Sequence, residues 1–414
     1  MNEAKQKFRL TGLERAWILY DVGNSAFVLL VATLIPIFFN ALAEGGGLSS
    51  VEYLAYWGYA ASAVTVITAV LSPILGTLAD TRNFKKPIFT FCVAVGVIGC
   101  CAMGMASTWL PFLLIFIFAK VGFSGSLVFY DSMLSDVTVP DRMDEVSSKG
   151  YAWGYIGSCV PFVVCLALVL GAGSIGISQM TALNLALFIT AAWWLVTTLP
   201  LLRQYKQVHF VEVQEHAIRQ SFARIGHTLR HLKEDRQVFW FLLAFFCYID
   251  GVYTIIDMAT AYGTALGLDT TGLLLALLVT QIVAFPSALV FGRLSGQYPS
   301  GTLIPVCIAA YAGIALFAFF LKHQWQFWVL AVVVGMFQGG IQALSRSHFA
   351  KIIPPEKSGE YFGLFDICGK GASFLGTMIV SVGSQLTGSA NVGVGSLIVL
   401  FIVGFVLFRV SDRK

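Results

Sequence analysis

The sequence predicts an all-α integral membrane protein, with twelve transmembrane helices arranged as two six-helix pseudo-repeats. Three observations predict it: a low charge content, a succession of apolar runs long enough to cross a bilayer, and a similarity between the two halves of the chain. Of the 414 residues, 57% are hydrophobic and 12% are charged, about half the charged fraction that soluble proteins carry. Lipid, rather than water, is therefore expected to cover most of the surface.

The apolar runs set the number and order of the predicted helices. A helix needs about 20 apolar residues to cross the bilayer core. Such runs lie near 16–42, 52–79, 87–107, 110–137, 146–171, 179–202, 237–264, 270–292, 301–320, 325–352, 358–386 and 391–409. This pattern predicts an N-terminal six-helix bundle (1–202), a linker (203–236) and a C-terminal six-helix bundle (237–414). Apolar residues at helical spacing in the linker predict an amphipathic helix on the inner leaflet.

The distribution of positive charge predicts the orientation. Most of the 26 lysines and arginines fall at the two termini, in the linker and in the loops of the same side, whereas the loops of the other side hold only Lys322. Because cytoplasmic loops are enriched in lysine and arginine, we expect a multi-pass protein of the plasma membrane with both termini in the cytoplasm. The net charge of +4 reflects this asymmetry and gives no support for nucleic-acid binding.

No pattern indicates a metal, a cofactor or an enzyme. The eight cysteines all fall within apolar runs and none forms a C-x-x-C pair, so we expect buried thiols rather than disulfides or metal ligands. No G-x-x-x-x-G-K-[ST] motif occurs, and the sequence therefore gives no indication of ATP-driven activity.

Two pairs of segments resemble each other at an offset near 214 residues. FYDSMLSDVTVP (129–140) ends the fourth run, and ALSRSHFAKIIP (343–354) ends the tenth. In the same way, SPILGTLAD (72–80) corresponds to FPSALVFGRLSG (285–296). Membrane proteins built from two parallel six-helix repeats hold their solute near the middle of the membrane, at the interface of the repeats. We therefore expect a solute cavity there.

The connection after the second run carries a recognisable motif. It reads GTLADTR (76–82), followed by Lys85 and Lys86, and resembles the signature that the major facilitator superfamily has between its second and third helices. The usual glycine after the acidic residue is replaced by Asn83.

Three longer motifs narrow the resemblance. WILYDVGNSAF (17–27), QALSRSHFAKIIP (342–354) and GEYFGLFDICGKGASFLG (359–376) resemble the vacuole-effluxer branch of that superfamily. The branch includes the autophagy-related amino-acid effluxers of fungal vacuoles and many bacterial relatives, and this chain resembles a bacterial-type member. Val22 stands where the branch has an aromatic residue. The resemblance implies the twelve-helix major facilitator fold and the export of small solutes, with amino acids as the implied class.

The resemblance also implies that the first, fourth, seventh and tenth helices line the cavity. Polar residues occur within all four of these runs: Asp21, Asn24, Lys120, Asp131, Asp250, Asp257, Gln338, Gln342 and Arg346. An ionisable side chain inside the membrane costs several kcal/mol unless it is paired or hydrated, so each of these positions is a candidate functional site.

The candidate substrate-binding residues are Asp21, Asn24, Lys120, Asp250, Gln338 and Gln342. Asp250 lies near the middle of its run, where burial disfavours the charged carboxylate. Asp250 and, further out, Asp257 are therefore the candidate proton-coupling residues. The alternatives are that a neighbouring helix permanently neutralises Asp250, that Asp257 forms a structural pair with Lys120, and that the two glutamines only make interhelical hydrogen bonds.

A second set of charged residues lies toward the cytoplasm. Asp131 and Arg346 occupy nearly equivalent positions in the two repeats, and we predict that they form an ion pair which closes the inner gate when the cavity faces outward. Asp366 and Lys370 are four residues apart, a helical spacing at which opposite charges neutralise each other. The candidate cytoplasmic gate residues are Asp80, Arg82, Asp131, Arg346, Asp366 and Lys370.

Together these features predict a monomeric secondary active transporter in the lipid bilayer. It is expected to export a small polar or zwitterionic solute, such as an amino acid, by alternating access, with protons as the candidate coupling ion. A sugar or an amphiphilic drug is the alternative solute. A non-transporting membrane sensor or a lipid scramblase on the same scaffold is the alternative of another class; the lack of an extramembrane signalling domain in the sequence disfavours the sensor.

Overall fold

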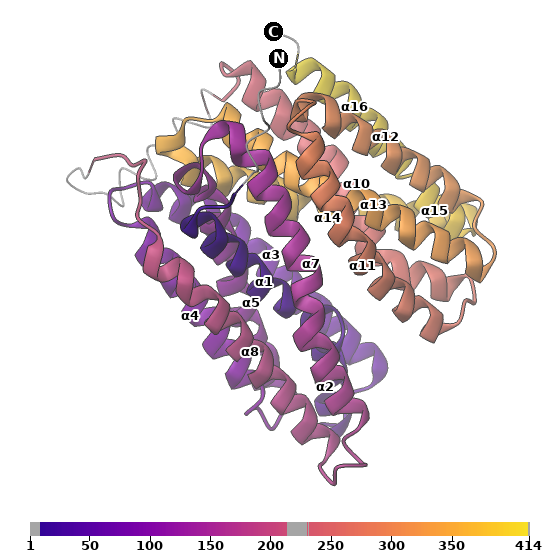
Figure 1. The fold of residues 1–414 in the computed structure, drawn as a ribbon. Helices are drawn as coiled ribbons and strands as arrows, with labels where there is room; N and C mark the ends of the chain where they lie inside the picture. The colour runs from indigo at the N-terminus through magenta and orange to yellow at the C-terminus, as the bar shows by residue number, and fades with distance from the viewer. Residues whose placement is uncertain (1–8, 213–229, 231, 413–414) are drawn as a thin grey trace.

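The structure is a computed structural model that describes residues 9–212, 230 and 232–412. Among these residues it consists of helices and short connections, apart from one isolated bridge between Thr81 and Val211. Figure 1 shows the long helices packed in two groups, one from each half of the chain. The amphipathic helix predicted in the linker falls mostly on residues 213–229, outside the described residues.

Helices from the first half make up what we term the N-half, and helices from the second half make up the C-half. The N-half contains α1 (Gly12–Ala32), α2 (Leu34–Gly45), α3 (Ser50–Ala79), α4 (Lys85–Met103), α5 (Trp109–Ser132), α6 (Leu134–Val137), α7 (Pro140–Leu170) and α8 (Gln179–Gln204). The C-half contains α10 (Arg236–Ala265), α11 (Thr270–Leu294), α12 (Ser300–Phe319), α13 (Gln324–Ile352), the 3-10 turn η1 (Pro355–Lys357), α14 (Ser358–Thr387), α15 (Ala390–Gly395) and α16 (Ile398–Ser411).

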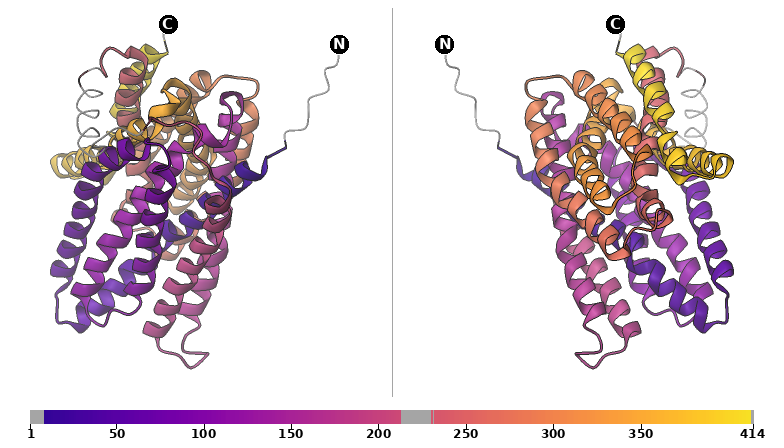
Figure 2. Two further views of the ribbon diagram at one scale, coloured as in Figure 1. Left: turned by 90° about the vertical axis from the view of Figure 1, so that its left-hand side faces the viewer. Right: turned by 90° about the vertical axis from the view of Figure 1, so that its right-hand side faces the viewer.

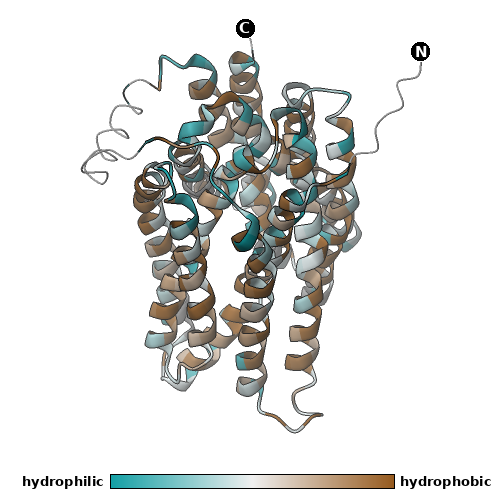
Figure 3. Ribbon diagram, turned by 60° about the vertical axis from the view of Figure 1, so that its left-hand side comes forward, coloured by the Kyte–Doolittle hydropathy of each residue, from teal (hydrophilic) through white to brown (hydrophobic). Residues whose placement is uncertain are grey.

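These helices account for the twelve predicted membrane crossings. Eleven helical segments among the described residues are long and apolar enough to cross a membrane, and α14 adds a helix of 30 residues that packs against α3. Figure 3 shows that hydrophobic residues follow the length of the helices, while hydrophilic residues gather toward one end. Large apolar side chains such as Phe91 and Phe118 are about two-thirds exposed, as expected for a surface that lipid covers.

The structure divides some of the predicted runs. The first run is broken at Thr33, between α1 and α2, because Pro36 has no N–H to donate to the carbonyl of Ala32 and its ring crowds that carbonyl. The last run is also divided, into α15 and α16, and the fourth ends at Ser132 before the short α6. The number of crossings is unchanged.

Helix positions repeat between the halves. α4 begins at Lys85 and α12 at Ser300, while α5 begins at Trp109 and α13 at Gln324. The offset is 215 residues in both cases, in agreement with the similar segments of the sequence. The repeat places the ends of α5 and α13, which carry Asp131 and Arg346, at corresponding positions.

The start of α1 and the end of α16 lie on the same side of the molecule (Figures 1 and 2). We term this side the terminal face; it also carries the connections 80–84, 138–139, 295–299 and 353–357. We term the other side the opposite face. The halves meet where α3 packs against α14 and where α7 packs against α11 and α13. These are the contacts that position the charged site.

Candidate functional site

Arg346 lies in the contact between the two halves near the terminal face. It projects from α13 of the C-half, and only 2% of its side chain is exposed. Its Nη1 lies 3.0 Å from Asp131 Oδ1, and its Nη2 lies 3.6 Å from Asp21 Oδ2. The predicted ion pair between Asp131 and Arg346 is therefore present, and Asp21 lies beside it.

Three aromatic rings of the N-half also face the guanidinium of Arg346. Its Cζ lies 4.6 Å from the ring centroid of Trp17, 5.3 Å from that of Tyr130 and 4.3 Å from that of Tyr151. At distances below about 6 Å a cation is attracted by the electron-rich face of a ring. Ser147 adds two acceptors, its Oγ at 2.9 Å from Nε and its carbonyl at 3.0 Å from Nη2. The guanidinium is thus both neutralised and hydrogen-bonded.

Contacts within the N-half hold these groups in place. Trp17 Nε1 donates to the carbonyl of Tyr130 at 2.9 Å, and the two rings stack with their centroids 4.3 Å apart. Tyr130 Oη donates to Asp21 Oδ2 at 3.0 Å. A Cβ atom on Gly150 would lie 2.9 Å from Asp21 Oδ2 and 3.1 Å from both Arg346 and Trp17, so a glycine at this position lets α7 approach α1.

A ladder of polar contacts continues along α13 toward the terminal face. Ala343, Ser347 and Lys351 are spaced four residues apart and so share one side of the helix. The carbonyl of Ala343 accepts from Ser147 Oγ at 2.8 Å, and Ser347 Oγ donates to Asp144 Oδ1 at 2.6 Å. Lys351 Nζ lies 2.6 Å from Asp144 Oδ2. These contacts join α13 to α7 of the other half.

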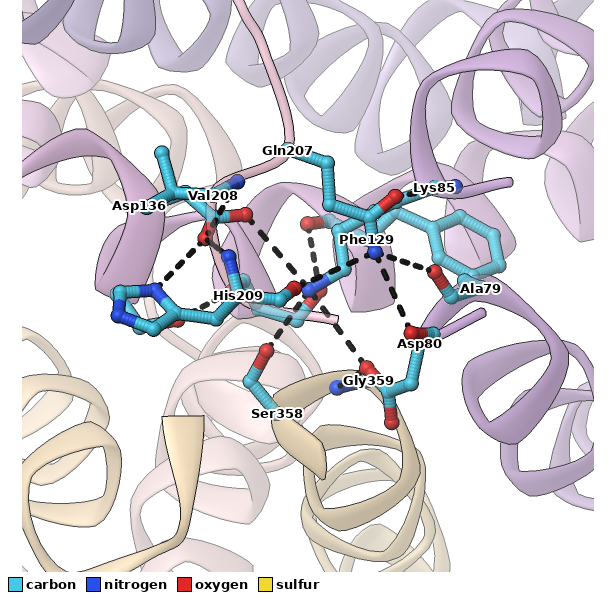
Figure 4. Close-up of polar contacts among 12 residues, drawn as sticks. Ala79, Asp80, Lys85, Phe129, Asp136, Gln207, Val208, His209, Ser358 and Gly359 are labelled. Carbon is cyan, nitrogen blue, oxygen red and sulfur yellow. Dashed lines mark hydrogen bonds and ion pairs between the residues drawn. The ribbon is translucent and has the colours of Figure 1, made fainter. Parts of the chain in front are cut away.

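Asp80, at the end of α3, accepts hydrogen bonds from the start of α14. The backbone N–H of Gly359 donates to its Oδ1 at 2.7 Å, and that of Glu360 donates to its Oδ2 at 2.8 Å. These N–H groups lack partners within their helix and carry partial positive charge. A Cβ on Gly76 would lie 2.2 Å from the carbonyl oxygen of Gly359, so only glycine permits this approach. Figure 4 shows Asp80 beside Gly359.

Lys85 completes this contact from the start of α4. Its Nζ donates to Ser358 Oγ at 2.8 Å and lies 3.6 Å from Asp80 Oδ1 and 4.0 Å from Asp136 Oδ2. The side chains of Lys85, Asp80 and Asp136 are fully buried. One cation therefore neutralises two carboxylates of the N-half and contacts the C-half at the same time (Figure 4).

The structure does not place Arg82 in the contact between the halves. Its Nη1 lies 3.3 Å from Glu212 Oε1 at the start of the linker, and both side chains are exposed. The same part of the linker covers Asp136, which accepts from the backbone N–H of His209 at 2.9 Å and from Tyr205 Oη. Burial raises the pKa of the Tyr205 phenol well above its usual value, so this hydroxyl stays protonated and remains a donor.

Asp250 differs from the carboxylates of the terminal face. It is fully buried in α10, and its Oδ1 accepts from the backbone N–H of Gly376 at 2.9 Å and from Thr254 Oγ1 at 3.3 Å. Its Oδ2 is buried without a hydrogen-bond partner among the described residues, and no cation among them forms an ion pair with it. A Cβ on Gly376 would lie 2.6 Å from Oδ1, so the glycine makes the backbone contact sterically possible.

The other acidic candidate on α10, Asp257, lies about two helical turns beyond Asp250 toward the opposite face. Its side chain is exposed, and Lys120 of α5 is close enough to act on it electrostatically. Lys120 Nζ also lies 4.7 Å from the ring centroid of Phe123. The structure therefore brings Lys120 and Asp257 into one region, between helices of different halves.

The uncharged candidates have different surroundings. Asn24 Nδ2 donates to the carbonyl of Tyr20 in its own helix at 3.0 Å. Gln342 Oε1 accepts from Tyr155 Oη of α7 at 3.0 Å, and so takes part in the contact between the halves. Gln338 is buried, and its Oε1 has no hydrogen-bond partner within the part of the chain that the structure describes.

Asp366 contributes to the packing of α14 against α3. Its Oδ2 accepts from Ser72 Oγ at 2.7 Å. The side chain of Lys370 lies outside the described residues, and so does the predicted pairing of Lys370 with Asp366. Asp366 is thus in contact with the N-half, and its assignment to the gate stays a prediction.

Sequence reasoning missed several residues of the site. Trp17, Tyr130 and Tyr151 were not singled out because aromatic residues near a membrane surface usually pack against lipid or other helices. Their signal is position: Trp17 is four residues before Asp21, and Tyr130 immediately precedes Asp131. Lys85 was named only as part of the motif after the second run, since nothing in the neighbouring sequence distinguishes a buried lysine at a helix start from an exposed one.

The described residues of the site contain no recognisable metal centre. No group of three or more His, Cys, Asp or Glu residues among those described is arranged to hold a metal ion. A separate apolar cavity lies inside the C-half, between α10, α11 and α13, with Thr254, Tyr262 and Phe327 among its lining residues. It contains none of the charged candidates.

Comparisons with known proteins agree on one family. The sequence profile described as vacuole effluxer Atg22 like matches residues 13–139 and 135–414. YxiO of Bacillus subtilis (strain 168), an uncharacterized MFS-type transporter, is 42% identical over 404 residues, covering 96% of this chain and 94% of that protein. Autophagy-related protein 22 of Coccidioides immitis (strain RS) is 25% identical over 315 residues, covering 65% of this chain and 51% of the fungal protein.

Solved structures share the fold at low sequence identity. The human organic anion transporter MFSD10 (TETRAN) has a TM-score of 0.72 at 14% identity, over 96% of this chain and 98% of that one. The major facilitator transporter FucP, in its outward conformation, has a TM-score of 0.72 at 16% identity, over 97% of this chain and 98% of that one. The chain therefore belongs to the vacuole effluxer Atg22-like family, and its fold is that of the major facilitator superfamily of transporters.

Proposed function

We propose that this protein exports a small polar or zwitterionic solute, such as an amino acid, by alternating access in the plasma membrane. The terminal face is the cytoplasmic face in this proposal, in agreement with the excess of lysine and arginine there. The transporter family supports the general activity, and the effluxer description of that family supports the direction. The described conformation is then the one in which the cytoplasmic gate is closed.

The observation that carries the proposal is the contact of the buried Arg346 with the partly buried Asp131. The two charges come from different halves, on α13 and α5. Removing one partner of a buried ion pair is strongly destabilising, because the other charge stays buried without compensation. When the halves separate, by contrast, water reaches both charges and hydrates them. A charged contact of this kind is therefore better suited to a gate that opens and closes than a permanent apolar contact would be.

The surroundings of Asp250 support proton coupling. A buried carboxylate with one unpartnered oxygen is costly while it is charged, and binding of a proton removes the charge. Asp250 also contacts both α10 and α14, so a change in its charge acts on the packing of two helices in the C-half. This is the arrangement expected of a group that exchanges a proton during the transport cycle.

Acidic and basic groups near one another support a zwitterionic solute. Lys120 and Asp257 lie on α5 and α10, the fourth and seventh predicted crossings, which the family resemblance implies to line the cavity. Lys120 is suited to a solute carboxylate, and Asp257 to a solute ammonium group. A sugar would use neither charge, and so it is the weaker alternative.

Flux measurements in proteoliposomes test the proposal. Purified protein is reconstituted, and uptake of a panel of labelled amino acids is measured with and without a pH gradient. We expect flux of at least one amino acid that a pH gradient accelerates, and we expect Asp250→Asn to abolish the acceleration. Asp257→Asn is the comparison variant on the same helix; it is expected to weaken solute binding while the gradient still acts.

Three outcomes would contradict parts of this proposal. The absence of flux for every amino acid would exclude the amino-acid class. Gradient-independent exchange that is unchanged in Asp250→Asn would exclude the proton role. Movement of labelled lipid between the leaflets, without solute flux, would instead support a scramblase.

A further inference from the structure

The groups around Arg346 form a complete cation site within the N-half. We term the following residues the cation box: Trp17, Asp21, Tyr130, Asp131 and Tyr151. They project from α1, α5 and α7, and Ser147 of α7 adds two further acceptors. Arg346, by contrast, comes from α13 of the C-half. The box and the cation that fills it therefore belong to the two bodies that alternating access moves apart.

Three residues of the cation box, Trp17, Tyr130 and Asp21, are held by contacts that do not involve Arg346. Trp17 bonds to and stacks on Tyr130, and Tyr130 donates to Asp21. Tyr151 lies one position after Gly150, which allows α7 to pack closely against Asp21 and Trp17. When Arg346 leaves, these contacts keep Trp17, Tyr130 and Asp21 in place.

A vacant box is electrostatically unfavourable. Asp21 and Asp131 lie near the same point, with 8% and 21% of their side chains exposed. Two carboxylates held this close together repel each other even after water has entered between the halves. The departure of Arg346 therefore creates a strong preference for another cation in the same place.

We propose that a positively charged group of the transported solute replaces Arg346 in the cation box when the terminal face opens. This inference rests on the proposed transport function and names the substrate class: solutes that carry a guanidinium group. Arg346 and the solute occupy the box alternately. Closure of the terminal face returns Arg346 to the box and displaces the solute cation from it.

The geometry favours a guanidinium over other cations. Asp131 Oδ1, Ser147 Oγ and the Ser147 carbonyl accept hydrogen bonds from three different nitrogens of one planar group. The rings of Trp17 and Tyr151 offer faces on which such a planar group stacks. A hydrated sodium ion gains little from the rings, and an ammonium group cannot satisfy all three acceptors in the same fork-like geometry.

Ligand binding to a variant with a vacated box tests the inference. In Arg346→Gln, purified in detergent, thermal unfolding is followed with L-arginine, with L-citrulline and with sodium chloride at matched ionic strength. Citrulline has nearly the shape of arginine and lacks the side-chain charge. We expect arginine at saturation to raise the Tm by about 3 °C or more and citrulline and sodium to have no comparable effect. In Arg346→Gln/Tyr151→Leu the arginine effect should be lost, and in Arg346→Gln/Tyr151→Phe, which keeps the ring, it should remain.

Equal stabilisation by arginine, citrulline and sodium would overturn the inference, as would an arginine effect that survives Tyr151→Leu. If Arg346→Gln does not fold, the protein with Arg346 intact is tested by flux. Methylguanidinium on the terminal side should then inhibit transport in the unchanged protein and in Tyr151→Phe, with at least a tenfold weaker effect in Tyr151→Leu; equal inhibition of all three would overturn the inference. Arginine binding without any flux would support the cation box as a binding site and exclude the transport function. Flux without cation binding would support the transport function and exclude the cation box as a solute site.

Discussion

Two acidic sites of this protein, the partly buried Asp131 in the N-half and the fully buried Asp250 in the C-half, differ in what accompanies the charge. Asp131 faces a buried guanidinium from the other half at 3.0 Å. Among the described residues, Asp250 accepts hydrogen bonds only from a backbone N–H and a threonine hydroxyl, and one of its oxygens has no partner there. The first site joins the halves, whereas the second lies within one half.

This difference indicates that the two carboxylates have different roles. A carboxylate paired with a cation across an interface makes the stability of that interface depend on the pair. A carboxylate without a cation makes local packing depend on whether a proton is bound. We therefore expect Asp131 to control which face is closed and Asp250 to control coupling, and substitutions should separate the two roles.

The largest expected effect is that of Arg346→Gln. It leaves Asp21 and Asp131 without their cation, and the loss of one partner of a buried pair costs about 3–5 kcal/mol. Thermal unfolding in detergent should show a large decrease in Tm. The double variant Arg346→Gln/Asp131→Asn, which removes one of the two uncompensated charges, should recover part of that decrease. If the double variant is less stable by the sum of the single effects, the two residues are not coupled in the folded protein.

The next prediction compares two substitutions of the same chemistry. Asp131→Asn should destabilise the protein by about 2–3 kcal/mol, because it removes a charged partner of buried Arg346. Asp250→Asn should leave stability unchanged or increase it by about 1 kcal/mol, since it replaces an unpaired buried carboxylate by a neutral group of the same shape. Both are measured by thermal unfolding at neutral pH. Destabilisation of equal size would erase the distinction between the sites.

A third prediction changes the packing of the two halves at the terminal face without changing any charge. In Gly359→Ala the new Cβ would lie 2.4 Å from the carbonyl oxygen of Gly76 and 2.7 Å from Asp80 Oδ1. We expect this clash to destabilise the closed conformation by about 1–3 kcal/mol. The fraction of molecules in which the terminal face is open should therefore increase. Gly313→Ala is the control, because its Cβ would meet no atom within 4 Å. Protease or reagent accessibility of the terminal face should increase only in Gly359→Ala.

The smallest expected effect on stability comes from a substitution in the contact between α13 and α7 near the terminal face. Ser347→Ala removes one hydrogen bond to Asp144, which keeps its contact with Lys351, and should cost about 1 kcal/mol. A small decrease in Tm with unchanged pH dependence of flux is the predicted result. A change in that pH dependence would mean that the contact of Ser347 with Asp144, and not Asp250 alone, takes part in proton coupling.

The sequence predicted the framework and part of the site. Twelve crossings followed from apolar length, and the pair of Asp131 with Arg346 followed from equivalent positions in the repeats. The break at Thr33 was missed because the run stays apolar on both sides of it, although Pro36 marks the position. Arg82 was predicted with the gate from its motif, but its side chain extends to Glu212.

The remaining contacts depend on how the halves are placed against each other. The sequence shows that Asp250 is buried; it does not show that its partner is the backbone N–H of Gly376, 126 residues away. In the same way, Tyr151 and Trp17 become a cation site only because α1 and α7 converge on the end of α13. Such contacts carry no local pattern of spacing or composition.

The most direct test of the account asks whether Arg346 keeps the terminal face closed. Spin labels are attached at Phe84 in the N-half and Tyr298 in the C-half, both exposed at the terminal face, in a variant without the eight cysteines. Pulsed electron resonance then measures the distances between the labels with and without Arg346→Gln. We expect one short distance with Arg346 present and an additional longer distance in Arg346→Gln. Identical distance distributions in the two proteins would contradict it.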